Sequence, residues 1–425
     1  MFAGPVSSPS GTQPEPPAPE PQAWLTPGVR GIGAASFLAD VGHEIPTALL
    51  PSLLTSTLGA PAAALGLIEG VSDGLAGAAK FAGGALADDP RRRRSVAVGG
   101  YSATAVLASL TGVATAAWQV GLLRAGAWTA RGLRVPSRNA LLADIVPASA
   151  YGRAYGFERM MDNLGAIGGP MLALGLVAAF DVRTAILLSV IPGLLAAVAI
   201  VYAIRKAPRL QPRERRPLRI RVRPVLQGEL GAVLGVVAAF EVGNVAATLM
   251  ILRATEQLQP EHGANAAAQL ALWLYVAYNL AATATSLPAG RASDRLGRRG
   301  PVLVMALGAA LFSLAYAALS LDVSTVATLA PGFLLAGLGI ACVETAESAA
   351  VAAFAPGDLR GSAFGLLATV QSLGNLAASG IAGLIWSTLG PAAAFRYLVV
   401  WMLIAAVGFV VLLTRAARGS SAAPA

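Results

Sequence analysis

Two stretches of this sequence resemble each other, GGALADDPRRRR at residues 83–94 and AGRASDRLGRRG at residues 289–300. Both contain a glycine and an aspartate with the spacing G-x-x-x-D, and arginines follow in both. The two copies are displaced by 206 residues, and each directly follows a long apolar segment. A polar signature that recurs in this way indicates an internal duplication.

Two other pairs of segments match at nearly the same displacement. ADIVPASAYGRAYGF at 143–157 shares Pro, Gly, Ala and Gly with AAFAPGDLRGSAFGL at 352–366. FLADVGHE at 37–44 aligns with AAFEVGNV at 238–245. Because three matches fall at nearly one displacement, the sequence predicts two related halves.

The composition is that of a protein embedded in a membrane. Of the 425 residues, 56% are hydrophobic and 12% are charged, against about 25% charged in soluble domains. Apolar segments long enough to cross a bilayer recur along the chain. We therefore predict an all-α membrane protein with twelve spans, near residues 31–55, 63–87, 95–117, 119–143, 153–180, 184–204, 229–252, 267–289, 301–321, 325–354, 363–388 and 392–414.

The basic residues predict the orientation of these spans. Lys and Arg concentrate in the tails and in every second gap between spans, which places those segments and both termini in the cytoplasm. The net charge of +9 is explained by this pattern, and no nucleic-acid partner is expected. The predicted domains are a disordered tail (1–28), a first half (29–206), a basic linker (207–228), a second half (229–415) and a tail (416–425).

The repeated loop resembles the signature G-x-x-x-D-R-x-G-R-R of the major facilitator superfamily. The second copy matches that signature at Gly290, Asp294, Arg295, Gly297, Arg298 and Arg299. The first copy keeps Gly84 and Asp88 but has Asp89 and Arg91 where Arg and Gly are usual. The resemblance implies two six-helix halves, a bacterial inner-membrane location, and spans 1 and 7 lining a central cavity. We expect a monomer.

A second motif resembles one found in the antiporter branch of that superfamily. GAIGGP at 165–170 supplies Gly165, Gly169 and Pro170 in the pattern G-x-x-x-G-P. The small pair expected after it is missing, since Ala173 and Leu174 stand there. The motif favours export, although any close helix crossing could use the same residues.

The loop signature predicts a latch between helices. An aspartate at a helix end can accept hydrogen bonds from the free N–H groups at the start of a neighbouring helix, where the helix dipole also favours negative charge. We therefore expect Asp88 and Asp294 to act in a cytoplasmic gate. The alternative is that the charges only stop translocation.

Ionisable residues inside the predicted spans are the candidate functional groups. Asp40, His43 and Glu44 share one helix face, since they are three and four residues apart. A charge at this depth costs about 3 kcal/mol or more unless it meets a wet cavity or a partner. Glu241 and Asn244 hold the matching places in the second half. The cavity or proton-coupling candidates are Asp40, His43, Glu44, Glu69, Asp73, Arg131, Asp162, Glu241, Asn244, Glu344 and Glu347.

A structural role in ion pairs between helices is the alternative for most of these groups. The arginines of span 4 need acidic partners, and Asp40, Glu69, Asp73 and Asp162 are available. The excess of acids hints at a cationic substrate, although proton coupling explains it as well.

The function predicted is secondary transport by alternating access, as a proton-coupled exporter of a small molecule or cation. Proton-coupled uptake of a small polar solute is the alternative on the same fold. An enzyme or a sensor without transport is the alternative of another class. GHEIPT at 42–47 has Thr47 where a zinc protease needs its second histidine, and no P-loop motif is present. No metal site and no cofactor are expected.

Overall fold

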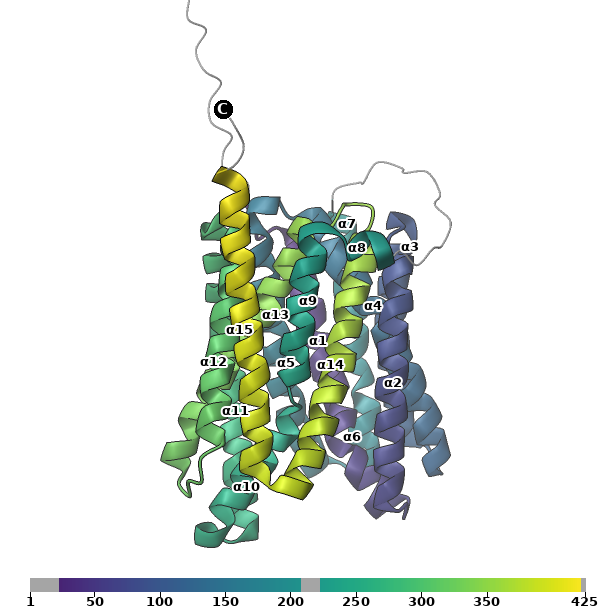
Figure 1. Cartoon of the computed structure of the whole chain (residues 1–425). Helices are drawn as coiled ribbons and strands as arrows, with labels where there is room; N and C mark the ends of the chain where they lie inside the picture. The colour runs from purple at the N-terminus through teal and green to yellow at the C-terminus, as the bar shows by residue number, and fades with distance from the viewer. Residues whose placement is uncertain (1–22, 208–221, 422–425) are drawn as a thin grey trace, which may run out of the picture.

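The computed structural model describes residues 23–207 and 222–421, and every regular element among them is a helix (Figure 1). The predicted disordered tail and basic linker fall largely on residues 1–22 and 208–221, outside the described part. The first half contains α1 (Pro27–Ser52), α2 (Ala62–Ala87), α3 (Pro90–Leu110), α4 (Ala117–Ile145), α5 (Tyr151–Ala179), α6 (Val182–Leu188) and α7 (Val190–Lys206). The second contains α8 (Val222–Val225), α9 (Gly228–Gly243), α10 (Ala247–His262), α11 (Ala264–Arg295), α12 (Gly300–Leu319), α13 (Val326–Phe354), α14 (Arg360–Leu389) and α15 (Pro391–Ser421).

The predicted fold of twelve spans is confirmed. In the described residues, nine helical segments are long and apolar enough to cross a membrane by composition alone, with α6 and α7 forming one segment and α9 and α10 another. Helices α1, α2 and α4 complete the bundle. They have comparable length, but their ionisable residues lower their hydropathy.

The two halves repeat the same set of helix contacts. In the first half α1 packs on α5 and α7, α4 packs on α2 and α3, and α3 packs on α7. In the second half α9 packs on α14 and α15, α13 packs on α11 and α12, and α12 packs on α15. Each helix thus has a counterpart with the corresponding neighbours, as expected for a duplicated unit.

Span 7 is broken in the middle, which the sequence did not reveal. Helix α9 ends at Gly243 and α10 starts at Ala247. The backbone N–H of Val245 donates to the hydroxyl of Tyr316 at 3.3 Å, and that of Ala246 to Ser379 at 3.0 Å. Side chains of α12 and α14 therefore replace the helical partners of these two amides.

Helices α2 and α14 join the two halves at one end of the bundle and diverge towards the other. Gly84, Gly77 and Gly70 lie seven residues apart, on nearly one face of α2. A Cβ on Gly84 would come within 2.8 Å of the carbonyl oxygen of Gly361, and one on Gly77 would lie 3.5 Å from Ser372. A Cβ on Gly70 would meet no described atom within 4 Å.

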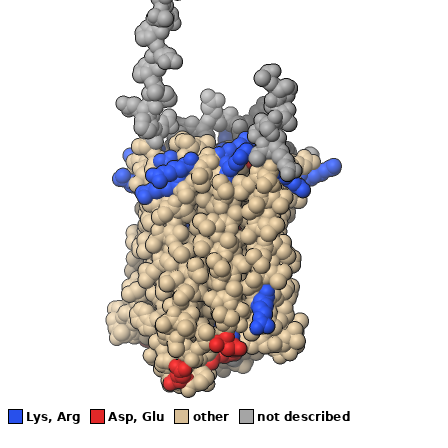
Figure 2. All heavy atoms as spheres, turned by 60° about the vertical axis from the view of Figure 1, so that its left-hand side comes forward, with Lys and Arg blue, Asp and Glu red and all other residues tan. Residues whose placement is uncertain are grey.

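The closed end of the bundle is also its basic end. The backbones of Gly152 in α5 and Gly290 in α11 touch there, next to Asp294. Lys and Arg side chains gather around this end, whereas acidic side chains show at the opposite end (Figure 2). The wall between the two ends is almost free of charge on the face shown. The halves therefore meet at the basic end.

The charge distribution predicts where inserted reporters will lie. A reporter fused after Arg418 or inserted near Gln211 should be cytoplasmic, and one near Glu261 should be external, because arginine-rich loops are retained inside. Paired phosphatase and fluorescent-protein fusions measure this directly. An external reporter after Arg418 would contradict the even number of spans.

The glycine contact predicts a steric block. Gly365→Ala would place a methyl group 2.6 Å from the Cα of Gly84, and overpacking of this kind costs about 1–3 kcal/mol. We expect this variant to favour opening at the basic end, which thiol labelling of an engineered cysteine in that interface would detect in a Cys342→Ala background.

The matched control for this block is Gly380→Ala in the same helix. A Cβ on Gly380 would meet no described atom within 4 Å, so this variant receives the same gain in helix propensity without a clash. Equal labelling of both variants would contradict the block.

Candidate functional site

Asp40 and His43 of α1 meet α4. Asp40 pairs with Arg131 at 3.3 Å, and Nε2 of His43 contacts the same guanidinium. Because arginine can only donate, Nε2 must accept, and the proton of the neutral ring is assigned to Nδ1. The imidazole lies against the ring of Trp128, with 4.3 Å between centroids. Glu44 lies 3.8 Å from Nε2 of His43.

The ionisable residues of α2 have three different kinds of partner. Glu69 pairs with Arg124 at 2.7 Å. Asp73, expected as an arginine partner, accepts a hydrogen bond from the indole of Trp128 at 2.7 Å instead. Lys80 donates across the interface between the halves, to Ser372 of α14 at 2.7 Å.

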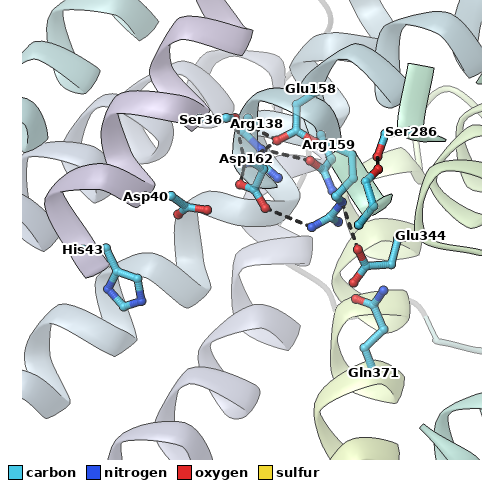
Figure 3. A network of polar contacts seen from close by, with 12 residues as sticks. Ser36, Asp40, His43, Arg138, Glu158, Arg159, Asp162, Ser286, Glu344 and Gln371 are labelled. Carbon is cyan, nitrogen blue, oxygen red and sulfur yellow. Dashed lines mark hydrogen bonds and ion pairs between the residues drawn. The ribbon is translucent and has the colours of Figure 1, made fainter. Parts of the chain in front are cut away.

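A chain of ion pairs runs from α4 through α5 to α13 (Figure 3). Arg138 lies 2.7 Å from Glu158 and 3.6 Å from Asp162. Arg159 pairs with Asp162 at 3.0 Å and with Glu344 at 3.2 Å. These five residues, hereafter the ion-pair chain, connect the first half to the second through the Arg159–Glu344 contact.

The buried carboxyls of the second half have neutral partners instead. Glu241 is 2% exposed and accepts from the amide of Asn244 at 3.0 Å. Glu347 is 1% exposed and accepts from the amide of Gln371, while its Oε2 has no partner in the described structure. The backbone of Glu241 packs on Gly374, three residues from Gln371. Both residues therefore lie against one turn of α14.

Sequence reasoning missed a row of polar residues on α14 that contacts Glu347 and the break in span 7. Gln371, Asn375 and Ser379 recur every four residues along α14. Asn375 donates to the backbone carbonyl of Asn244 at 3.0 Å. The hydroxyl of Ser379 accepts from the backbone N–H of Ala246, between α9 and α10. The four-residue spacing of uncharged polar residues was the available signal.

The aspartates of the loop signature both bind the start of a helix in the other half. Asp294 accepts from the backbone N–H groups of Gly152 at 2.7 Å and Arg153 at 3.0 Å, and from the Arg153 side chain at 2.7 Å. Asp88 accepts from the N–H of Ser362 at 2.8 Å and from its hydroxyl. Burial raises the pKa of the Asp88 carboxyl, although the hydrogen bonds from Ser362 act in the opposite direction.

The other residues of the second loop copy have smaller structural roles. Gly297 has a φ of 66°, a left-handed conformation that glycine adopts without strain. Arg298 pairs with Glu229 at 2.5 Å at the surface. Neither Arg295 nor Arg299 forms an ion pair within the described residues.

The GAIGGP segment packs α5 against α1. A Cβ on Gly165 would lie 2.6 Å from the carbonyl oxygen of Phe37, and one on Gly169 would lie 3.1 Å from that of Val41. Pro170 follows within the same helix. The two glycines thus bring α5 close to the turns of α1 that carry the ionisable residues.

Comparison of the sequence with known proteins places the chain in a family. The model of the Major Facilitator Superfamily matches residues 32–257 and 231–425. An uncharacterized MFS-type transporter of Methanocaldococcus jannaschii is 27% identical over 376 residues, covering 88% of this chain and 92% of that protein. An uncharacterized protein of Mycobacterium tuberculosis is 27% identical over 375 residues, covering 87% and 88%.

Solved structures share the architecture. The human organic anion transporter MFSD10 (TETRAN) aligns with a TM-score of 0.65 at 17% identity, over 91% of this chain and all of that one. A bacterial homologue of the iron transporter ferroportin, in an outward-facing state, aligns with a TM-score of 0.69 at 15% identity, over 91% and 99%. The chain belongs to the Major Facilitator Superfamily and is a multi-pass membrane transporter.

The aspartate contacts predict how the closed end responds to mutation. Asp294→Asn should fold and insert, but it removes the charge from the hydrogen bonds to α5, and bonds to charged groups contribute about 1.5–3 kcal/mol. We expect slower transport and more opening at the basic end, measured by flux and thiol labelling. Asp88→Asn should have a smaller effect, since its loop departs from the family signature.

Two outcomes decide this prediction. If both variants transport at the parental rate, the aspartates have no part in gating. If either variant is lost from the membrane or melts early, its aspartate serves folding instead.

Proposed function

We propose that this transporter is a proton-coupled secondary carrier that works by alternating access and exports a small molecule or a cation. The observation on which the proposal rests is the contrast between its buried carboxyls. Asp40 and Asp162 are paired with arginines, whereas Glu241 and Glu347 have only amide partners. A buried carboxyl without a cationic partner can exchange a proton with little structural change.

The packing of the halves supports alternating access. If the basic end lies in the cytoplasm, the contacts between the halves close the cytoplasmic side of the described conformation. The polar contacts that help to close it, Asp88 with α14 and Asp294 with α5, each join one aspartate to the start of a helix in the other half. Such contacts can break without disturbing the apolar core of either half.

The packing of α5 on α1 supports export over uptake. GAIGGP resembles a motif of antiporters, and here it holds α5 against the helix that carries Asp40 and Glu44. A substrate that reaches Glu44, which is 27% exposed on its side chain, meets a carboxyl group that forms no ion pair with an arginine within the described residues. This favours a cation or a polar molecule with a positive charge.

Neutral isosteres test the proton-coupling role. Glu241→Gln should lower the ratio of pH-driven flux to counterflow about 10-fold or more, within the usual range of coupling between two sites. Asp40→Asn should instead reduce stability, because removing one partner of a buried ion pair costs about 3–5 kcal/mol. The measurements are both fluxes in proteoliposomes, with a substrate found by thermal-shift screening, and the melting temperature.

The same assay separates the alternatives. A stable Glu241→Gln and Glu347→Gln double variant with normal pH-driven transport would exclude this pair from coupling. Accumulation driven by protons moving in the same direction as the substrate would identify an importer. Absence of any flux with a bound ligand would favour a sensor.

A further inference from the structure

A small cavity lies between α1, α3, α4 and α7 of the first half. Its volume is about 10 Å³, and its polar lining comes from His43, Tyr101, Thr104 and Arg134. A polar cavity of this size has room for one water-sized guest. It is separate from the ion-pair chain and from the carboxyls of the second half.

Arg134 lines this cavity without a compensating acid. The residue is 4% exposed, and it forms no ion pair or hydrogen bond with any described residue. Its guanidinium lies 4.0 Å from the centroid of the Tyr101 ring. A cation–π contact contributes about 2 kcal/mol when desolvated, which is less than the several kcal/mol needed to bury an ion. Arg134 therefore needs a negative partner that the described residues do not supply.

The other polar groups of the cavity can also donate. The hydroxyl of Tyr101 is buried and has no partner among the described residues, and the same is true of Nδ1 of His43. Nδ1 carries the proton because Nε2 faces Arg131. The nearby carboxylate of Asp40 is engaged by Arg131 at 3.3 Å. Three unpaired donors from three helices thus surround one cavity.

We propose that this cavity binds a single halide-sized anion, chloride in the cell, between Arg134, Tyr101 and His43. The anion supplies the missing negative charge and accepts from the three donors. It also holds His43 in the tautomer whose Nε2 accepts from Arg131. The anion therefore supports the contact of α1 with α4. This site lies apart from Glu241 and Glu347, on which the proton-coupling proposal rests.

The test uses the melting temperature of the purified full-length protein and needs no transport substrate. Sodium chloride or bromide is titrated against sodium gluconate at constant ionic strength and pH. We expect the melting temperature to rise by about 3 °C with halide concentration and then to level off. Crystals grown in bromide should show one anomalous peak at the cavity. Equal melting in chloride and gluconate, without a bromide peak, would mean that water fills the cavity and would overturn the proposal.

Variants locate the effect. Tyr101→Phe keeps the ring beneath Arg134 but removes the O–H, so halide should bind about 2- to 10-fold more weakly, as expected for one hydrogen bond. Arg134→Gln should abolish the halide dependence. Tyr202→Phe makes the same chemical change at a tyrosine that is 47% exposed, and its halide response should match the parent. An unchanged response in Tyr101→Phe would place the anion elsewhere and refute the site, even if Arg134→Gln fails to fold.

Discussion

The ion-pair chain is the constraint on which the arrangement of the helices depends. A buried charge is tolerated only with a partner, and loss of one partner costs about 3–5 kcal/mol. Arg138 and Glu158 therefore fix α4 against α5, and Ser36 ties α1 to both by donating to Glu158 at 2.8 Å. Arg159 extends the chain to Glu344 in the other half. The halves are thus held together by charge in the middle of the bundle and by backbone contacts at the basic end.

The sequence predicted the features that depend on the backbone or on repetition. The duplication and the spans followed from displacement and hydropathy. The contact of Asp294 with the start of α5 has the expected form, because free N–H groups occur at every helix start; its gating role stays a prediction. The partner of each carboxylate could not be predicted, since helical spacing defines a face but not what lies opposite. Asp73 therefore met Trp128 rather than an arginine.

The two halves have kept the positions of their acids while changing the partners. Asp40 and Glu241 occupy matching places, yet one faces a guanidinium and the other a carboxamide. The first half is rich in arginine on α4, and the second has polar but uncharged residues on α14. Duplication preserved the geometry, and later substitutions gave the halves different electrostatics.

The break between α9 and α10 gives span 7 a joint. Residues 244–246 take no part in either helix, and the two N–H groups that follow Asn244 are bound by hydroxyls of other helices. Helix α10 can therefore tilt without breaking a helical hydrogen bond in α9, where Glu241 remains anchored on α14. Span 7 is thus two short rods that meet at a pivot, and α10 can change its angle while α9 keeps its contact with α14.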